Sequence, residues 1–293
     1  MSRKKSGDLV RLGLIQMRVG ADPRRNLAKA VERIRQGARK GAQIVCLQEL
    51  FVSRYFPQSE DPKFFRLAEP IPGPTTDSLC RLARAEKIVL VASVFERRSA
   101  GIYHNTAVVI DADGSILGRY RKMHVPDDPC YYEKFYFTPG DLGFPTFKTR
   151  YGKIGVLVCW DQWFPEAARL ISLSGAQIIF YPTAIGWLSG ESRGAARAQR
   201  CAWELIQRGH AVANGVYVAA ANRVGREGKL NFWGSSFVVD PFGAIVAHAN
   251  EDQEEILLAR CDFKKIDETR QNWPFLRDRR IDAYGALTER FLD

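Results

Sequence analysis

The chain has 293 residues, of which 46% are hydrophobic and 26% are charged, so it is long and apolar enough to bury a substantial core. Its net charge of +10 comes from 43 Lys+Arg against 33 Asp+Glu, but these basic residues are dispersed and no nucleic-acid-binding motif accompanies them. The six cysteines form no CxxC pair and the four histidines lack metal-ligand spacing. We therefore expect neither a nucleic-acid-binding protein nor a metal or disulfide framework.

The N-terminal segment does not resemble an export signal. Arg3, Lys4 and Lys5 could form a charged region, but Asp8 and Arg11 interrupt the apolar stretch that should follow. No apolar run elsewhere is long enough to span a bilayer. We expect a cytoplasmic protein without membrane contact, and a reducing compartment would suit a free thiol.

In chain order, the first predicted helix follows Asp22, which is a good N-cap, with Pro23 in the first helical position. Gly41 should end this helix, and apolar residues keep helical spacing within it, at Leu27, Ala30, Val31, Ile34 and Ala38. Residues 41–48 and 116–121 are typical of strands. These segments predict a βαβ-type order in the first half of the chain.

Similar elements follow in the second half. Residues 153–158 are short, apolar and β-branched, which predicts a buried strand, and a helical pattern begins after Pro165. Another helix is predicted over about residues 196–212, with Gly215 as its terminator. Three apolar residues should share one face of that helix, namely Cys201, Leu205 and Val212.

Three sequence echoes occur in the same order in both halves. Residues 11–15, 41–45 and 108–116 resemble, in turn, residues 153–157, 175–179 and 237–245. The last pair has the pattern of a β-hairpin. We infer two pseudo-symmetric halves that each give one sheet, with helices on the outer faces. Because no linker interrupts the chain, we expect one domain over residues 1–293, an α/β four-layer α-β-β-α sandwich.

Three chemically useful residues stand at the ends of predicted strands. Glu49 and Lys122 follow the strands of the first half, and Cys159 follows residues 153–158. Ligands collect outside the carboxyl ends of strands in α/β proteins. A carboxylate, an ammonium group and a thiol there supply a base, an electrophile and a nucleophile. Nearby helix amides could also lower the pKa of the thiol.

The chain resembles the nitrilase-like carbon–nitrogen hydrolases over nearly its whole length. The resemblance rests on these three residues and on residues 122–126, 133–141, 159–169, 181–186, 222–225 and 277–280. Asp128 and Cys130 depart from the family pattern, because glycines are expected at both positions. The long run after Cys159 is most similar to the subgroup that hydrolyses N-carbamoylputrescine. The resemblance implies the four-layer fold named above.

The resemblance also implies a mechanism without a metal or organic cofactor. Glu49 would act as the general base and Cys159 as the nucleophile. Lys122 and the backbone N–H of Trp160 would stabilise the oxyanion, and Glu133 would help to position the lysine and the substrate. The products would be putrescine, ammonia and carbon dioxide, a reaction of polyamine biosynthesis.

The substrate implied by this subgroup carries a primary ammonium group at its far end, so its pocket needs an anionic or aromatic terminus. The sequence leaves the partner open among Asp127, Asp128, Asp161 and Glu191, with Trp160, Trp187 or Tyr131 as aromatic candidates. Trp163 could also line the pocket, whereas Cys130 and His124 are expected to be bystanders.

Two other functions stay open. The protein could act on a carbamoyl amino acid or a small amide, whose carboxylate would favour an arginine in the pocket. It could also be a catalytically inactive scaffold that binds nucleic acid or a protein through its basic surface. The segment 270–293 is rich in arginine and aromatic residues, and family resemblance implies a homo-oligomer in which this tail packs on a neighbouring subunit.

Overall fold

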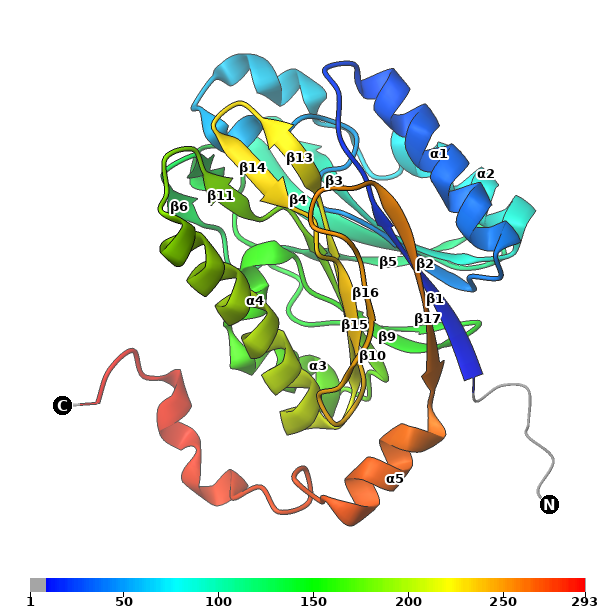
Figure 1. Cartoon of the computed structure of the whole chain (residues 1–293), viewed down its shortest axis with the longest axis vertical. Coiled ribbons are helices and arrows are strands. Elements are labelled where there is room, and N and C mark those ends of the chain that lie inside the picture. Colours follow the sequence, from blue (N-terminus) through cyan, green and yellow to red (C-terminus); the bar gives the residue numbers. More distant parts are fainter. Residues whose placement is uncertain (1–8, 293) are drawn as a thin grey trace.

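The computed structural model describes residues 9–292 and has four layers, two sheets packed face to face between two pairs of helices (Figure 1). The first sheet has six strands in the order β17-β1-β2-β3-β4-β5. Its strands are β1 (Leu9–Gln16), β2 (Ile44–Leu47), β3 (Val89–Ser99), β4 (Ile102–Ile110), β5 (Ile116–Arg121) and β17 (Glu255–Asp262). The basic residues 3–5 lie outside the described part of the chain.

The second sheet also has six strands, in the order β16-β15-β12-β10-β9-β8. Its strands are β8 (Thr146–Thr149), β9 (Gly152–Val156), β10 (Ile178–Thr183), β12 (Tyr217–Asn222), β15 (Phe237–Val239) and β16 (Ile245–His248). Two small sheets lie beyond it and consist of β11 (Gly186–Leu188), β13 (Val224–Glu227) and β14 (Leu230–Trp233), and of β6 (Asp127–Asp128) and β7 (Tyr131–Tyr132).

Helices cover both outer faces, as the sequence predicts. α1 (Pro23–Arg39) and α2 (Pro74–Glu86) pack on the first sheet, and α3 (Pro165–Leu173) and α4 (Arg193–Asn214) pack on the second (Figure 1). The predicted N-cap is confirmed, because the Asp22 side chain accepts a hydrogen bond of 2.9 Å from the Arg24 amide. The remaining helices are α5 (Lys264–Asn272) and the 3₁₀ helices Phe56–Gln58, Pro62–Leu67, Glu133–Phe135, Cys159–Trp163, Ile281–Ala283 and Gly285–Thr288.

The two halves have the same order of elements. The first half contributes β1-β2-β3-β4-β5 to its sheet, and the second half contributes β9-β10-β12-β15-β16 to its own. In each sheet the first strand also pairs with an antiparallel neighbour, β17 beside β1 and β8 beside β9. The ordered sequence echoes therefore mark equivalent strands, and the prediction of pseudo-symmetric halves is confirmed.

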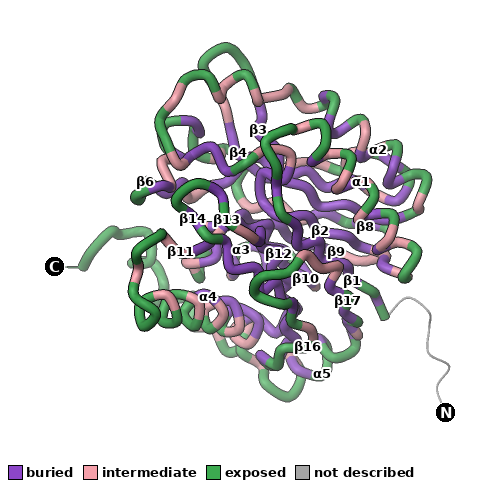
Figure 2. Tube along the Cα trace, turned by 45° about the horizontal axis from the view of Figure 1, so that its top comes forward, coloured by how far each residue is buried: buried purple, intermediate pink, exposed green. Residues whose placement is uncertain are grey.

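The main core lies between the sheets, where strand residues are buried on both faces (Figure 2). Leu12 and Val91 of the first sheet belong to one apolar cluster with Val156 and Val218 of the second, and all four are fully buried. Burying one such side chain contributes about 1.5–3 kcal/mol. This packing fixes the ends of both sheets relative to each other, and with them the residues that follow the strands.

Two features of the helices differ from the predictions. α2 was not predicted, although Leu79, Leu82 and Ala83 form its buried face. In α4 the predicted apolar face points outward: Cys201 and Leu205 are exposed, and Trp203 and His210 are buried instead. Among the described residues, no helix is long and apolar enough to cross a membrane.

Candidate active site

Glu49 lies at the carboxyl end of β2 and is completely buried. Its Oε1 accepts two hydrogen bonds, from Lys122 Nζ at 2.8 Å and from Asn105 Nδ2 at 2.7 Å. Its Oε2 is also buried but has no hydrogen-bond partner among the described residues. The carboxylate is thus held by one oxygen, and the other is free to accept a proton from a group that enters the site.

Lys122 follows β5 and lies between two carboxylates. Besides Glu49, its Nζ donates to Glu133 Oε2 at 2.7 Å, and all three side chains are buried. Burial alone would lower the pKa of Lys122, but Glu133 and Glu49 outweigh it and raise this pKa above its ordinary value. Lys122 is therefore a permanent cation with a fixed position.

Glu133, in the 3₁₀ helix after β7, completes this cluster. Its Oε1 accepts a hydrogen bond of 2.5 Å from the Tyr55 hydroxyl. Burial raises the pKa of Glu133 to about 7, against the attraction of Lys122. Two carboxylates share one ammonium group, so the cluster carries an excess negative charge when both are ionised.

Cys159 begins the 3₁₀ helix Cys159–Trp163, and its side chain is at the edge of an internal cavity with only 4% of the residue exposed. Its φ of 45° lies in the left-handed region, which costs a non-glycine residue about 1–3 kcal/mol. Burial, and then the charge of Glu49, raise the pKa of this thiol well above its ordinary value. The net change is therefore opposite to the lowering that nearby helix amides could give, because desolvation and the carboxylates dominate.

Asp161 holds the turn that carries Cys159. Its Oδ2 accepts from the Val158 amide and the Tyr120 hydroxyl, both at 2.8 Å, and its Oδ1 accepts from the His124 amide at 3.0 Å. The ring of His124 also lies 2.7 Å from Oδ1 through Nδ1. Both oxygens are occupied and Asp161 is fully buried. It is therefore a structural residue of the nucleophile turn, in contrast to the prediction that it could bind the substrate's cation.

The cavity beside Cys159 has a volume of about 380 Å³. Its walls are mostly apolar or aromatic, with two carboxylates and one amide, and the lining residues are Pro126, Asp128, Pro129, Tyr131, Cys159, Trp160, Trp163, Ile185, Gly186, Leu188, Glu191, Gln199 and Ala202. Of the residues predicted for the far end of the substrate, the structure thus brings Asp128, Tyr131, Trp160 and Glu191 to the cavity. Such a pocket suits a small, partly apolar molecule.

Besides Asp161, two predicted residues do not line this cavity in the described part of the chain. Asp127 is an exposed residue of β6. Trp187 of β11 packs on Trp233, with ring centroids 5.4 Å apart, and donates from Nε1 to the carbonyl of Ala196 at 2.9 Å. Trp187 instead fixes the start of α4 against the small sheet.

Cys130 lies in the turn between β6 and β7 with a φ of 65°. This left-handed conformation favours glycine, which explains why the family pattern predicts glycine at this position. Cys130 is buried and, unlike its neighbours Pro129 and Tyr131, is not one of the described residues that line the cavity. In residues 9–292 no cluster of three or more His, Cys, Asp or Glu side chains could hold a metal ion.

Sequence reasoning missed three residues that support the site. Tyr55 bonds to Glu133, Asn105 bonds to Glu49, and Arg223 donates from Nη2 to the carbonyl oxygens of Glu49 and Leu50, both at 2.9 Å. Arg223 belongs to one of the motifs that carried the family resemblance, which is the only signal that could have identified it. No sequence pattern could have identified Tyr55 or Asn105. Tyr55 lies in a loop and Asn105 in the middle of a strand, and only tertiary packing brings them to the site.

These features agree with comparisons with known proteins. The model of the carbon-nitrogen hydrolase family matches residues 11–271, and the chain belongs to this family. An N-carbamoylputrescine amidase of Solanum lycopersicum is 43% identical, and the match covers 95% of each chain.

Two further proteins are similar to almost the whole chain. A citrullinase of Francisella tularensis is 40% identical over 96% of this chain and 99% of its own. The crystal structure of a carbon-nitrogen hydrolase from Helicobacter pylori G27 is 48% identical, with a TM-score of 0.94, and the match covers 97% of this chain and all of the other. The four-layer sandwich predicted from the sequence is thus the fold of the family.

Proposed function

We propose that the protein is a thiol hydrolase that cleaves the carbamoyl C–N bond of N-carbamoylputrescine. One observation carries the catalytic part of this proposal. A neutral buried thiol, Cys159, opens on a cavity next to a cluster in which Glu49 has one unpartnered carboxylate oxygen and Lys122 is a fixed cation. The charges of Glu49, Lys122 and Glu133 all act on the pKa of Cys159, which supports the proposal that the four side chains share one site.

In the first half of the reaction, the thiol sulfur attacks the carbamoyl carbon while Glu49 Oε2 takes the thiol proton. A neutral resting thiol requires this transfer, because its raised pKa leaves little thiolate at neutral pH. The Lys122 ammonium and the Trp160 N–H would stabilise the oxyanion; removing one such donor typically costs about 3 kcal/mol. Glu49 then returns the proton to the departing nitrogen, and ammonia leaves an enzyme-bound thiocarbamate.

In the second half, a water molecule attacks the thiocarbamate carbon and Glu49 takes a proton from it. The C–S bond breaks, the proton returns to the sulfur, and the released carbamic acid decomposes to the amine and carbon dioxide. Glu133 would keep the Lys122 ammonium in place through both steps, since their hydrogen bond of 2.7 Å is buried.

The similarity to N-carbamoylputrescine amidases over 95% of the chain supports the choice of substrate. The cavity supports it independently. Its lining includes Asp128 and Glu191 but, among the described residues, no lysine or arginine. A cationic terminus would therefore be attracted and a carboxylate terminus repelled. The chain's net charge of +10 opposes a cation only weakly, because salt screens exposed charges over about 10 Å.

The test is ammonia release from a panel of N-carbamoylputrescine, N-carbamoyl-β-alanine, citrulline, a dicarboxylic acid monoamide and a nitrile. We expect the highest kcat/KM for N-carbamoylputrescine and no turnover by the Cys159→Ala variant. Equal or reversed preference against N-carbamoyl-β-alanine would contradict the substrate assignment. Turnover by Cys159→Ala would contradict the assignment of the nucleophile.

Citrulline is the second candidate substrate, because the citrullinase is 40% identical along almost the whole chain. Citrulline carries the same carbamoyl group but ends in an ammonium and a carboxylate. The carboxylate would need a cationic partner in the cavity. The panel above distinguishes the two substrates directly. They share the carbamoyl group that Cys159 attacks and differ only in the part of the molecule beyond it.

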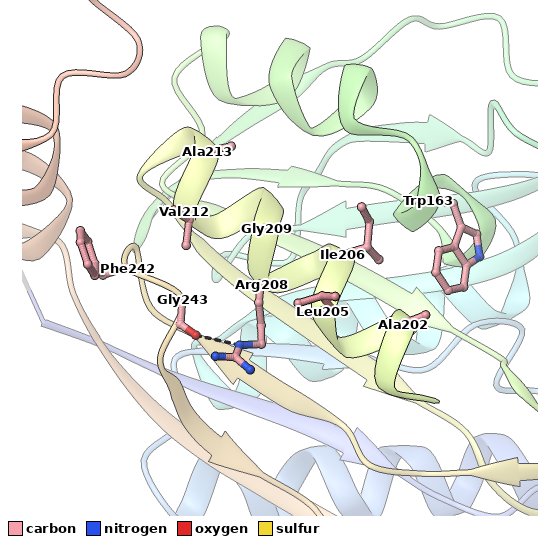
Figure 3. A pocket seen from close by; sticks show the side chains of 10 residues that line it. All are labelled: Trp163, Ala202, Leu205, Ile206, Arg208, Gly209, Val212, Ala213, Phe242 and Gly243. Atoms are coloured by element: carbon pink, nitrogen blue, oxygen red, sulfur yellow. Dashed lines mark hydrogen bonds between the residues drawn. The ribbon is translucent and has the colours of Figure 1, made fainter. Parts of the chain in front are cut away.

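We further propose that the protein is a cytoplasmic homo-oligomer. An apolar groove of about 780 Å³ runs along the outer side of α4, between Trp163 and Phe242 (Figure 3). Leu205 in this groove is 67% exposed. The tail after α5 carries further exposed apolar side chains and adjoins the groove, since the rings of Trp273 and Phe242 are 5.4 Å apart. A second copy of the chain would cover both surfaces.

A further inference from the structure

We infer that Glu191 is the residue that recognises the ammonium end of the substrate. This inference rests on the proposed function, because it concerns the same cavity and the ammonium group of the proposed substrate. Glu191 lies in the connection between β11 and α4 and lines the cavity that Cys159 also lines. It is the one candidate whose carboxylate has a buried oxygen without a partner.

The hydrogen bonds of Glu191 leave one of its carboxylate oxygens without a donor. Its Oε1 accepts one weak bond, 3.3 Å long, from Gln199 Nε2. Its Oε2 is buried and has no hydrogen-bond partner among the described residues, and no ion pair to Glu191 is found in residues 9–292. A buried anionic oxygen without a donor is unfavourable, and a cationic N–H donor would satisfy it. A primary ammonium group, with three donors, provides such a partner.

The other carboxylates are less suitable. Asp161 has both oxygens occupied within the nucleophile turn, and Asp127 does not line the described cavity. Asp128 lines it but is exposed, so water competes for its charge. Glu191 therefore offers the stronger interaction with a cation.

The apolar part of the cavity lining matches the rest of the substrate. Pro126, Pro129, Ile185 and Leu188 give an apolar lining suited to a methylene chain. Gln199 is exposed and also lines the cavity, so it lies where the cavity meets solvent. Its bond to Glu191 orients the carboxylate from that side. We conclude that the cavity selects for a carbamoyl group at one end and for a cation at the other.

The test compares N-carbamoylputrescine with N-pentylurea, which has a methyl group in place of the ammonium group. Wild-type protein should hydrolyse N-carbamoylputrescine with the higher kcat/KM. In Glu191→Gln, kcat/KM for N-carbamoylputrescine should fall by about ten- to a hundredfold, mainly through KM, while the value for N-pentylurea stays nearly unchanged. The matched control Asp128→Asn should change the ratio of the two values by much less.

The outcomes separate this inference from the proposed function. A wild-type preference for the ammonium substrate that survives in Glu191→Gln would overturn the role of Glu191, and loss of that preference in Asp128→Asn alone would move the role to Asp128. No turnover of either urea by wild-type protein would overturn the proposed function and this inference with it. Melting curves of both variants check the fold, and titration calorimetry of N-carbamoylputrescine into Cys159→Ala, with and without Glu191→Gln, measures binding without turnover.

Discussion

Arg223 donates a hydrogen bond of 2.9 Å to the backbone carbonyl of Glu49, and the two residues come from opposite halves of the chain. The same guanidinium bonds to the carbonyl of Leu50, whose φ of 47° is unusual for a non-glycine residue, and to the carboxylate of Glu227. The candidate base is therefore positioned from the second half of the chain, through its backbone.

Replacing Arg223 with methionine should lower both stability and activity. The change leaves Glu227 buried without its ion-pair partner, although the Tyr55 amide still donates to it, and such a loss typically costs about 3–5 kcal/mol of the free energy of unfolding. It also frees the turn that carries Glu49, so kcat should fall. Urea denaturation and ammonia release measure the two effects. Arg226→Met is a matched control, since Arg226 is exposed on β13 and should cost almost nothing. A stable, fully active Arg223→Met variant would disprove this role.

Alkylation of Cys159 by iodoacetamide should depend on Glu49. Because burial and Glu49 raise the pKa of the thiol, reaction at neutral pH needs a base to remove its proton. Glu49→Gln removes this base, although it also removes the charge that helps to raise the thiol pKa. We expect the loss of the base to dominate, so that the labelling of Cys159 slows. Exposed Cys201 in the same sample is the internal control, and its rate should not change. Mass spectrometry of the labelled peptides gives both rates. Equal labelling of Cys159 in wild type and variant would argue against Glu49 as the base.

The pH dependence of kcat/KM should reflect Glu133. Burial raises the pKa of this carboxyl to about 7, so it is protonated below that pH and ionised above it. Protonated Glu133 no longer holds the Lys122 ammonium by an ionic hydrogen bond, so Lys122 pairs with Glu49 alone, and kcat/KM should therefore fall as the pH drops through neutrality. In Glu133→Gln the value should be low throughout, and the acid limb near neutral pH should disappear. Profiles from about pH 5 to about pH 9 test this; an acid limb retained in the variant would assign it to another group.

Deleting residues 276–293 should lower the oligomeric state measured by light scattering. The deletion leaves Trp273 and its ring contact with Phe242 intact, but it removes the most exposed apolar residues of the tail, including Phe291, which is 80% exposed. Leu205→Asp tests the groove itself, because a charge there opposes the burial of an apolar surface. An unchanged mass in both variants would contradict assembly through this face.

The sequence was sufficient for much of the fold, because local signals agreed with the final packing. Asp22 and Pro23 mark the start of α1, and Gly215, with its φ of 58°, ends α4. The outward apolar face of α4 could not be predicted in the same way. Cys201 and Leu205 have the spacing of a core face, and only the packing of Trp203 on the sheet reveals which side is buried.

The site was predictable where its residues end strands. Glu49, Lys122 and Cys159 could be selected because parallel topology brings strand ends together. The ranking of Asp128, Asp161 and Glu191 required coordinates, since these carboxylates differ in burial and in the number of hydrogen bonds that each already accepts. The spacing of residues in the sequence does not predict how many hydrogen bonds a carboxylate accepts or how deeply it is buried.

The pseudo-symmetry of the fold does not extend to its chemistry. Glu49 and Lys122 belong to the first half and Cys159 to the second, so a chain cut in the exposed stretch 141–143 would give two fragments that each lack part of the reactive set. The second fragment would still carry β17, whose antiparallel register with β1 offers a backbone template for reassociation. Neither fragment alone should turn over substrate, and activity should return only when the two are mixed. The two halves of the intact chain thus act like two different subunits joined in one polypeptide.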